Sequence, residues 1–389
     1  MERITVESLS NRQLNRATLA RQLLLEREAR SAEEVIGHLV GLNAQDPEPP
    51  YVGLWSRIRD AQPDALETLL HDRTVVRGSL FRGTQHIVLA RDYWWIQELL
   101  RPMLVRVQRN AFGRATSGID PEELVATAHS LLADGPLTRP DLGRALAEKW
   151  PDRDPMALAR SVQFLTTVVH PPPDGTWEWR GKTPFLSAAR WLGAPPEDAP
   201  DDPAQRLVLR YLAAFGPAST RDVQAWSGLT GLRHAIAELR PRLQVFRSEE
   251  GRELFDLPDA PRPDPDVDAP VRFLAPLDNV LLAHHDRNRV VDDEQRRHTF
   301  LEAAMTLDGF VHGLWRVRHV DTTATLIVRV FQPVPKRAKD EVISEGLKLL
   351  RFVALRADEQ DVRFHEIDSP WPPGTPWSCW PKKAARRSR

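Results

Sequence analysis

The sequence predicts an α+β protein in which three tandem winged-helix modules precede a mostly β C-terminal module. A repeated pattern supports this prediction: an apolar helix, a Gly-Pro pair and a Thr-Arg start of a second helix occur at 124–146 and again at 205–229. Each set of helices leads into a segment with the alternation of a β-hairpin. After an acidic, proline-rich linker at 256–270 the composition becomes β-rich. Repetition on this scale indicates repeated modules.

A chain of 389 residues is long enough for several modules. The expected modules are a first winged helix at 8–116, a second at 120–196, a third at 203–258, the β-rich module at 270–381 and a basic tail at 382–389.

The first module begins with an amphipathic helix predicted over 10–27, with Ser10 or Asn11 as its N-cap. Ser31 and the acidic residues after it predict the start of a second helix. We expect that helix to end near Gln45, because the next residue precedes a proline and is therefore disfavoured in α conformation. The remaining elements predicted for this module are helices at 51–58 and 63–71 and a β-hairpin at 75–90.

In the second and third modules Gly-Pro ends the first helix, and a threonine, Thr138 or Thr220, caps the next one. The same corner could have arisen twice independently, but both copies would still be winged helices. The predicted third helices lie at 155–169 and 230–240, and the predicted wings lie at 175–184 and 243–257.

The C-terminal module is predicted to be mixed and mostly β. Its predicted β-rich segments lie at 271–291 and 323–331, and one helix is predicted at 339–354. The stretch 370–381 contains three tryptophans and five prolines, and we expect it to lie on this module as a strap.

Composition limits the possible functions. The net charge is −1, but seven arginines lie between 74 and 116, against two acidic residues. The single cysteine, Cys379, excludes an internal disulfide and a multi-cysteine zinc site. The N-terminus lacks the apolar run of a signal peptide, and no stretch approaches the ~20 apolar residues that span a bilayer. We therefore expect a soluble, cytoplasmic protein that does not bind membranes and acts as a monomer.

The stretch Leu42-Asn43-Ala44-Gln45-Asp46-Pro47 carries two neutral amides two residues apart. If the chain is extended there, both side chains point to the same side and could hold a water molecule. The local pattern alone favours a simpler interpretation, in which Asn43 is a helix C-cap and Gln45 a solvated loop residue.

Winged helices make DNA the first partner to consider. The chain resembles the AlkZ/YcaQ-type DNA glycosylases, a family of tandem winged-helix proteins. The resemblance covers roughly 8–370 and includes SNRQLNRATLARQLLL near the start, the LNAQDP stretch, PYVGLWSR, RGTQH at 82–86 and LDNVLLAHHDRNRVV at 277–291. Such a resemblance, spread over every module, favours a functional role for Gln45.

The resemblance implies a monofunctional glycosylase that excises N7-alkylated guanine, including bulky natural-product adducts or crosslinks, from duplex DNA. It implies a role in alkylation repair or in self-resistance to an antibiotic. The catalytic residues would be Gln45 and Asn43. Asn43 stands where the family usually has a glutamine, so its amide lies one methylene further back and either holds the water or only shapes the loop. Asp46 is expected to be structural.

The expected DNA contacts lie in three segments. Arg82, Thr84 and His86 belong to the RGTQH segment, and Trp179 and Arg180 to the second predicted wing. His285, Arg287 and Arg289 alternate as on an exposed strand edge, which could contact phosphates or the minor groove. The alternative for His285, Arg287 and Arg289 is a solvated strand edge. The alternative for the second predicted wing is that its tryptophans pack on the wing's own core.

We expect no metal and no cofactor, because adjacent histidines such as His284 and His285 rarely face one ligand and no zinc-type spacing is present. Residues 1–148 contain no lysine, which favours a monofunctional enzyme, because a Schiff-base lyase needs an amine near the sugar. The alternative function is a non-catalytic winged-helix transcription regulator.

Overall fold

The structure is a computed structural model, and it describes residues 6–375 except 178, 198 and 300. The predicted basic tail and the end of the predicted strap, at 376–381, lie outside the described residues. The chain is a mixed α+β protein, as predicted. No helix among the described residues is long and apolar enough to cross a membrane.

The N-terminal third of the chain follows the predicted order of helices and hairpin. Ser10 and Ser31 each cap a helix through a capping box, as predicted. The hairpin at 75–90 is also confirmed. The elements here are β1 (Ser8–Leu9), α1 (Asn11–Arg21), α2 (Ala32–His38), β2 (Leu42–Asn43), α3 (Pro49–Trp55), α4 (Pro63–His71), β3 (Val75–Ser79), the 3₁₀ turn η1 (Phe81–Gly83), β4 (Gln85–Leu89) and the long helix α5 (Ala90–Phe112).

Two of the predicted helix ends are wrong. Helix α1 ends at Arg21 instead of continuing to 27, because Leu23 has a φ of 57° and leaves the right-handed helical region. Helix α2 ends at His38 and not near Gln45, because Val40 has a φ of 59° and the glycine after it a φ of 109°. The chain is consequently a strand at Leu42–Asn43, and Gln45 lies in the bend that follows.

The second part of the chain has the order helix, strand, helix, helix, strand, strand. Thr138 caps α7 as predicted. The predicted wing at 175–184 is wrong in its position: residues 175–177 form turns and a bend, 179–183 contain no strand, and the paired strands β6 and β7 lie on either side. The elements are α6 (Pro121–Leu131), β5 (Leu137–Thr138), α7 (Arg139–Lys149), α8 (Pro155–Leu165), β6 (Val168–Val169), β7 (Pro184–Ser187) and α9 (Ala188–Leu192).

The third part repeats the same order, with an isolated bridge between Ala218 and Phe255 in place of the first strand. Ser219, and not Thr220 as predicted, caps the second helix. The predicted hairpin at 243–257 is confirmed. The elements are α10 (Pro203–Phe215), α11 (Thr220–Ser227), α12 (Arg233–Leu239), the 3₁₀ turn η2 (Arg240–Arg242), β8 (Gln244–Ser248) and β9 (Glu253–Asp256).

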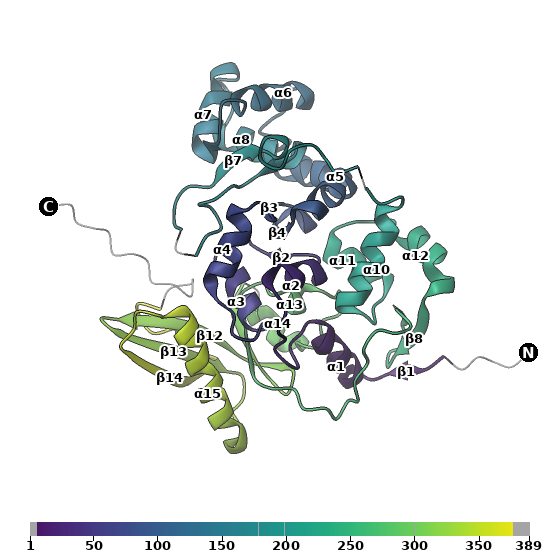
Figure 1. The fold of residues 1–389 in the computed structure, drawn as a ribbon, viewed down its shortest axis with the longest axis vertical. Coiled ribbons are helices and arrows are strands. Elements are labelled where there is room, and N and C mark those ends of the chain that lie inside the picture. The colour runs from purple at the N-terminus through teal and green to yellow at the C-terminus, as the bar shows by residue number, and fades with distance from the viewer. Residues whose placement is uncertain (1–5, 178, 198, 300, 376–389) are drawn as a thin grey trace, which may run out of the picture.

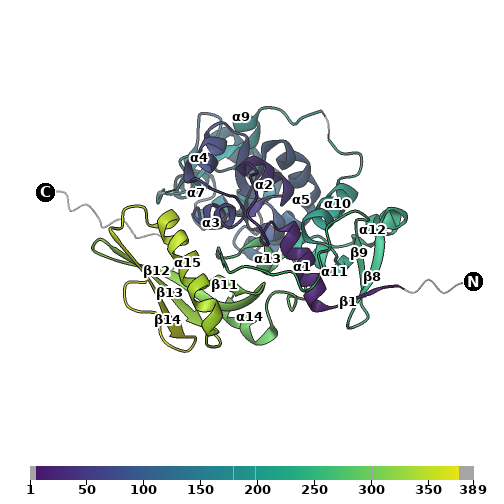
Figure 2. The same ribbon diagram turned by 60° about the horizontal axis from the view of Figure 1, so that its bottom comes forward.

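The C-terminal part is a five-stranded sheet covered by one helix. The strand at 323–331 and the helix at 339–354 are confirmed, but only 272–274 of the predicted β-rich stretch 271–291 is a strand. The elements are β10 (Arg272–Leu274), α13 (Asn279–Leu282), α14 (Asp293–Thr299), β11 (Ala303–Leu307), β12 (Phe310–Val320), β13 (Thr323–Val330), α15 (Lys336–Val353) and β14 (Glu359–Glu366). Figure 2 shows α15 lying along this sheet. The start of the predicted strap contacts it, because Arg316 and Arg329 stack on Trp371 at 4.6 and 4.8 Å.

The sheets and cores connect parts that the sequence predicts as separate modules. A six-stranded sheet runs β2-β4-β3-β6-β7-β5 and crosses the expected boundary at 116–120, and β1 pairs with β8 in parallel. One apolar core contains residues of α2, α3 and α4 together with residues of the C-terminal sheet and α15. Accordingly, α2, α3 and α13 lie at the centre of the molecule in Figure 1, between the α6–α8, α10–α12 and β12–β14 regions.

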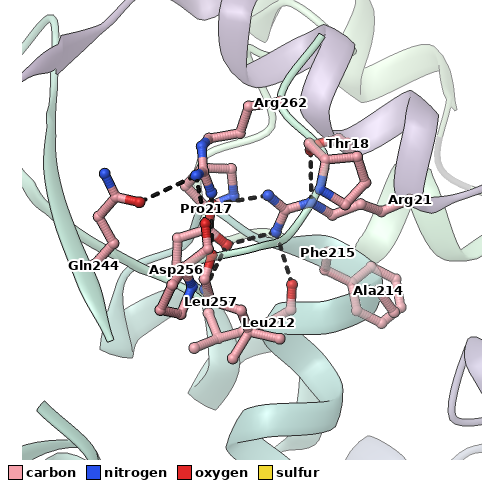
Figure 3. A network of polar contacts seen from close by, with 12 residues as sticks. Thr18, Arg21, Leu212, Ala214, Phe215, Pro217, Gln244, Asp256, Leu257 and Arg262 are labelled. Atoms are coloured by element: carbon pink, nitrogen blue, oxygen red, sulfur yellow. Dashed lines mark hydrogen bonds and ion pairs between the residues drawn. The ribbon is translucent and has the colours of Figure 1, made fainter. Parts of the chain in front are cut away.

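The stretch 256–270 is not a free linker, although the sequence predicts one. Asp256 is fully buried and accepts hydrogen bonds from Arg21 at 2.6 and 2.8 Å and from Arg262 at 2.7 Å (Figure 3). Further along, Arg12 and Arg16 on α1 donate to the carbonyl oxygens of Pro265 and Val267. The arginines of α1 therefore bind this stretch along its length.

Candidate active site

The two amides lie at the end of a short strand in the middle of the molecule. Leu42 and Asn43 pair antiparallel with Ile87 and His86 of β4, and the N–H of Ala44 donates to the carbonyl of Gln85 at 2.8 Å. Asn43 is only 6% exposed, whereas Gln45 is exposed. We call residues 43–48 the amide loop.

The two amide side chains have different tasks in the amide loop. The Oδ1 atom of Asn43 accepts a hydrogen bond from the backbone N–H of Gln45 at 3.2 Å. The Oε1 atom of Gln45 accepts one from the backbone N–H of Gln85, also at 3.2 Å. None of the described residues bonds to the Nε2 of Gln45. Asn43 thus shapes the loop. Gln45 exposes its side-chain amide to solvent, and the hydrogen bond to its oxygen fixes the orientation of that amide.

Gly41 explains why the chain can enter the strand so soon after α2. At its φ of 109° a side chain is strained, and a Cβ atom would lie 2.6 Å from Val88 and 2.8 Å from the carbonyl oxygen of Ile87. The Nδ2 of Asn279 donates to the carbonyl oxygen of Gly41 at 2.8 Å. The LDN segment at 277–279 therefore braces the strand that carries the amides.

Arg77 lies beneath the amide loop and donates hydrogen bonds to its backbone. Its Nε donates to the carbonyl oxygen of Ala44 at 2.9 Å, and its Nη2 donates to that of Gln45 at 3.2 Å. Its Nη1 is ion-paired with Asp174, from the loop between β6 and β7. Burial lowers the pKa of Arg77, and the charge of Asp174 opposes this shift.

Two further contacts join the loop between β6 and β7 to the amide loop and to α3, which follows it. Arg180 forms an ion pair with the buried Glu48 at 2.6 Å. Burial raises the pKa of Glu48, and the charge of Arg180 opposes the rise. The hydroxyl of Tyr51 donates to the carbonyl of Gly175 at 2.9 Å. Arg180, predicted to contact DNA, thus binds the protein here, and the neighbouring Trp179 is partly buried.

The RGTQH segment lies next to Asn43 but is already engaged by the protein. Arg82 has a φ of 57° and donates to the carbonyl of Trp226 in α11. Thr84 donates through Oγ1 to the carbonyl of Phe81 at 3.0 Å. His86 is buried, donates through Nδ1 to the carbonyl of Thr84 at 3.0 Å, and has its pKa lowered to about 3 by burial. At neutral pH His86 is consequently uncharged.

The segment 285–289 is a turn and not the strand edge that the alternation predicts. Arg289 is 6% exposed and donates to the carbonyl of Pro217 at 2.9 Å and to the hydroxyl of Thr18 at 3.3 Å. We therefore correct its predicted DNA contact to a structural role. His285 and Arg287 are partly exposed, and the charge of Arg287 lowers the pKa of Arg82, so these two guanidiniums lie near each other.

Sequence reasoning missed Arg77, Asp174, Glu48 and Asn279. A signal existed for Arg77, which is a charged residue inside the otherwise apolar strand segment VVRGS and must therefore find a buried partner. The partners come from 97 and 33 positions away, which no local pattern reveals. Among the described residues no group of three or more His, Cys, Asp or Glu side chains is placed to bind a metal.

The fold is that of a DNA glycosylase structure: it is similar to the Streptomyces sahachiroi DNA glycosylase AlkZ, with a TM-score of 0.75 at 21% identity, over 92% of this chain and 100% of that one. A curated relative from the same organism, named "Interstrand DNA cross-link repair glycosylase", is 26% identical over 350 residues, which is 77% of this chain and 85% of the relative. The chain belongs to the AlkZ-like DNA glycosylase family, whose model matches residues 36–352. It is a DNA glycosylase, and the alternative of a non-catalytic regulator is set aside.

Proposed function

We propose that this enzyme is a monofunctional glycosylase that excises N7-alkylated guanine from duplex DNA, with Gln45 placing the attacking water. One observation carries the proposal: the side-chain amide of Gln45 is exposed at the end of β2, with its oxygen orientated by the N–H of Gln85 at 3.2 Å. The second lone pair of that oxygen can accept a hydrogen bond from water, and the amide nitrogen can donate one.

Neutral amides suit this substrate. An N7-alkylguanine carries a positive charge, and breaking its glycosidic bond neutralises the base, so the leaving group needs no general acid. The enzyme then needs a placed water and an environment that tolerates an oxocarbenium-like sugar. The neutral His86 next to Asn43 adds no positive charge at neutral pH, because its pKa is lowered to about 3.

The proposal extends to crosslinks and to bulky natural-product adducts. Support comes from the relative whose name states interstrand crosslink repair. A role in self-resistance to an alkylating antibiotic, or in general alkylation repair, belongs to the same proposal. The test is release of free alkylguanine from duplexes carrying either a single N7 adduct or an interstrand crosslink. Release from neither substrate would refute the proposed specificity.

We further propose that 8–116, 120–196 and 203–258 are winged-helix modules, that 270–381 is a β-rich module, and that the enzyme binds DNA as a monomer. The order helix, strand, helix, helix, strand, strand in the second part supports this assignment. The proposed catalytic residues are Gln45 and Asn43. The proposed DNA contacts retain Arg82, Thr84, Trp179, Arg180, His285 and Arg287, which are all at least partly exposed. His86 is buried, as Arg289 is, and is not retained as a DNA contact.

We expect the product strand to remain intact. Excision should leave an abasic site that breaks only after alkali or an added endonuclease, because the N-terminal 148 residues contain no lysine. The measurement is denaturing electrophoresis with and without alkali, together with borohydride trapping. Lys182 follows Arg180 in the loop that packs on the amide loop, so a trapped adduct that disappears in Lys182→Ala would overturn the monofunctional assignment.

We expect Arg287→Ala and Arg289→Ala to differ. The side chain of Arg287 is partly exposed, so its loss should weaken DNA binding and reduce the salt slope by about one unit if it neutralises one phosphate. Arg289 is buried and bonded to the protein, so its loss should lower stability while the slope stays unchanged. Binding measured across salt concentrations, with thermal melts, checks both results. A slope that changes only for Arg289→Ala would contradict this assignment.

A further inference from the structure

The amide loop needs support, because it connects a two-residue strand to α3 and carries an exposed side chain that must place a water. The carbonyl oxygens of Ala44 and Gln45, on either side of the Gln45 side chain, are both bound by one guanidinium, that of Arg77, at 2.9 and 3.2 Å. Fixing two successive carbonyls restricts rotation of the peptide units that flank Gln45. This guanidinium therefore sets the direction in which the Gln45 side chain leaves the backbone.

Arg77 is itself fixed from all sides. It occupies the middle of β3, where it pairs with Ile87, and its carbonyl accepts the N–H of His170 at 2.9 Å. Its side chain is ion-paired with Asp174, and the two residues are each 3% exposed. A guanidinium held in such a fork loses little further freedom when it binds carbonyls, so it is pre-organised for this task.

The pairing with Asp174 also solves an electrostatic problem. A lone buried cation under the site would disfavour the positive charge that develops on the sugar in the transition state. The adjacent carboxylate of Asp174 compensates the charge of Arg77. The pair can therefore orientate the loop with less positive charge beneath it than a lone arginine would place there.

We propose that Arg77, fixed by Asp174, is a positioning residue that holds Gln45 in its reactive orientation. This inference rests on the proposed function of Gln45 and adds a role for residues from a distant loop. The guanidinium of Arg77 donates to backbone carbonyls and not to the Gln45 side chain, so it acts through the backbone of the amide loop. Misplacement of a reacting group by about 1 Å can cost on the order of 10²-fold in rate.

The test compares two buried arginine–aspartate pairs. Arg77→Lys keeps a charge next to Asp174 but loses the fork that binds two carbonyls. Arg21→Lys is the matched control, because Arg21 is equally buried, pairs with Asp256 and binds the carbonyl of Leu212 at 2.9 Å (Figure 3). Neither of these partners belongs to the amide loop. Both changes should lower thermal stability. At a temperature where both variants are folded, only Arg77→Lys should slow single-turnover base release, by about 10–100-fold, with DNA affinity almost unchanged.

Combination with Gln45→Ala separates positioning from a general structural role. If Arg77 acts through Gln45, Arg77→Lys should slow release by less than about threefold once Gln45 is alanine, because coupled residues are not additive. Rates are measured after subtracting release without enzyme. An equal loss in both backgrounds, or no loss in the wild-type background, would overturn the inference. If Gln45→Ala alone has no effect, the proposed catalytic role fails instead, which distinguishes the two failures.

Asp174→Asn serves as the second variant if Arg77→Lys does not fold. It preserves shape and removes the charge that fixes Arg77. Slower release with unchanged affinity is expected. Part of the loss should persist with Gln45→Ala, because the unpaired charge of Arg77 also opposes the positive charge that develops on the sugar. Release by Asp174→Asn at the wild-type rate would count against the inference.

Discussion

Gln45→Ala is expected to slow base release by about 10²–10³-fold, which lies within the usual worth of general-base-type assistance. DNA affinity should remain close to that of the wild type. Placement of a nucleophile matters in the transition state and not in binding, so the loss belongs in the rate. The loss is moderate because the cationic leaving group already weakens the glycosidic bond. Single-turnover release of alkylguanine and a separate equilibrium binding measurement check the two parts.

Three further variants sharpen this result. Asn43→Ala should cost less than Gln45→Ala, because the Oδ1 of Asn43 bonds the backbone of Gln45 and shapes the loop. Asn43→Gln should retain activity, since the amide is kept. Gln45→Glu adds a base and a negative charge facing the cationic sugar, so it should retain more activity than Gln45→Ala. Release by Gln45→Ala at the wild-type rate would move the search for the site to Thr84 and His86.

Asp256→Ala is expected to destabilise the protein by about 3–5 kcal/mol, the cost of leaving a buried charge unpaired. The carboxylate is 0% exposed and is bound by Arg21, by Arg262 and by the N–H of Leu257 at 2.9 Å. Without the Asp256 carboxylate, the buried guanidinium of Arg21 has lost its counter-charge at the contact between the ends of β9 and α1 (Figure 3). The midpoint and slope of urea unfolding, followed by circular dichroism, measure the change in the free energy of unfolding.

Arg262→Ala is the matched control for this prediction. The Arg262 side chain is 26% exposed, so its loss should cost no more than about 1 kcal/mol, as for surface ion pairs. The double variant Arg21→Met with Asp256→Leu should recover much of the stability lost by Asp256→Ala, because no buried charge is left unpaired. Equal destabilisation by Asp256→Ala and Arg262→Ala would show that the buried Arg21–Asp256 pair contributes no more to the free energy of unfolding than the partly exposed Arg262.

Local signals predicted the helices and hairpins well where the determining contacts are close in sequence. The capping boxes of Ser10 and Ser31 each involve a residue three positions away. Pro63 begins α4 at N1. The predicted N-cap of α11, Thr220, lies one position after the observed N-cap, Ser219, which is a small difference for a helix boundary.

The strand β2 shows where local signals fail. Apolar spacing predicted a helix through to Gln45, but β4 pairs with this segment from 41 to 45 positions away, and Asn279 bonds the carbonyl of Gly41. The alternation of His285, Arg287 and Arg289 resembled a strand for the same reason. Alternation of residue types with a period of two is not enough to form a β-strand, because a strand also needs a neighbouring strand to pair with. Among the described residues no strand pairs with 285–289.

The sequence by itself determined the α+β class, the repeated helix and hairpin order, the two amides and, through its resemblance, the glycosylase family. These depend on residue type and on spacing within a few turns. Only the tertiary structure decided that Asn43 is buried while Gln45 is exposed, that Arg289 is structural, and that Arg77 and Asp174 lie under the amide loop. Burial and pairing are set by segments far apart in the chain, and a charged residue in a sequence does not reveal which distant carbonyl or carboxylate it will meet.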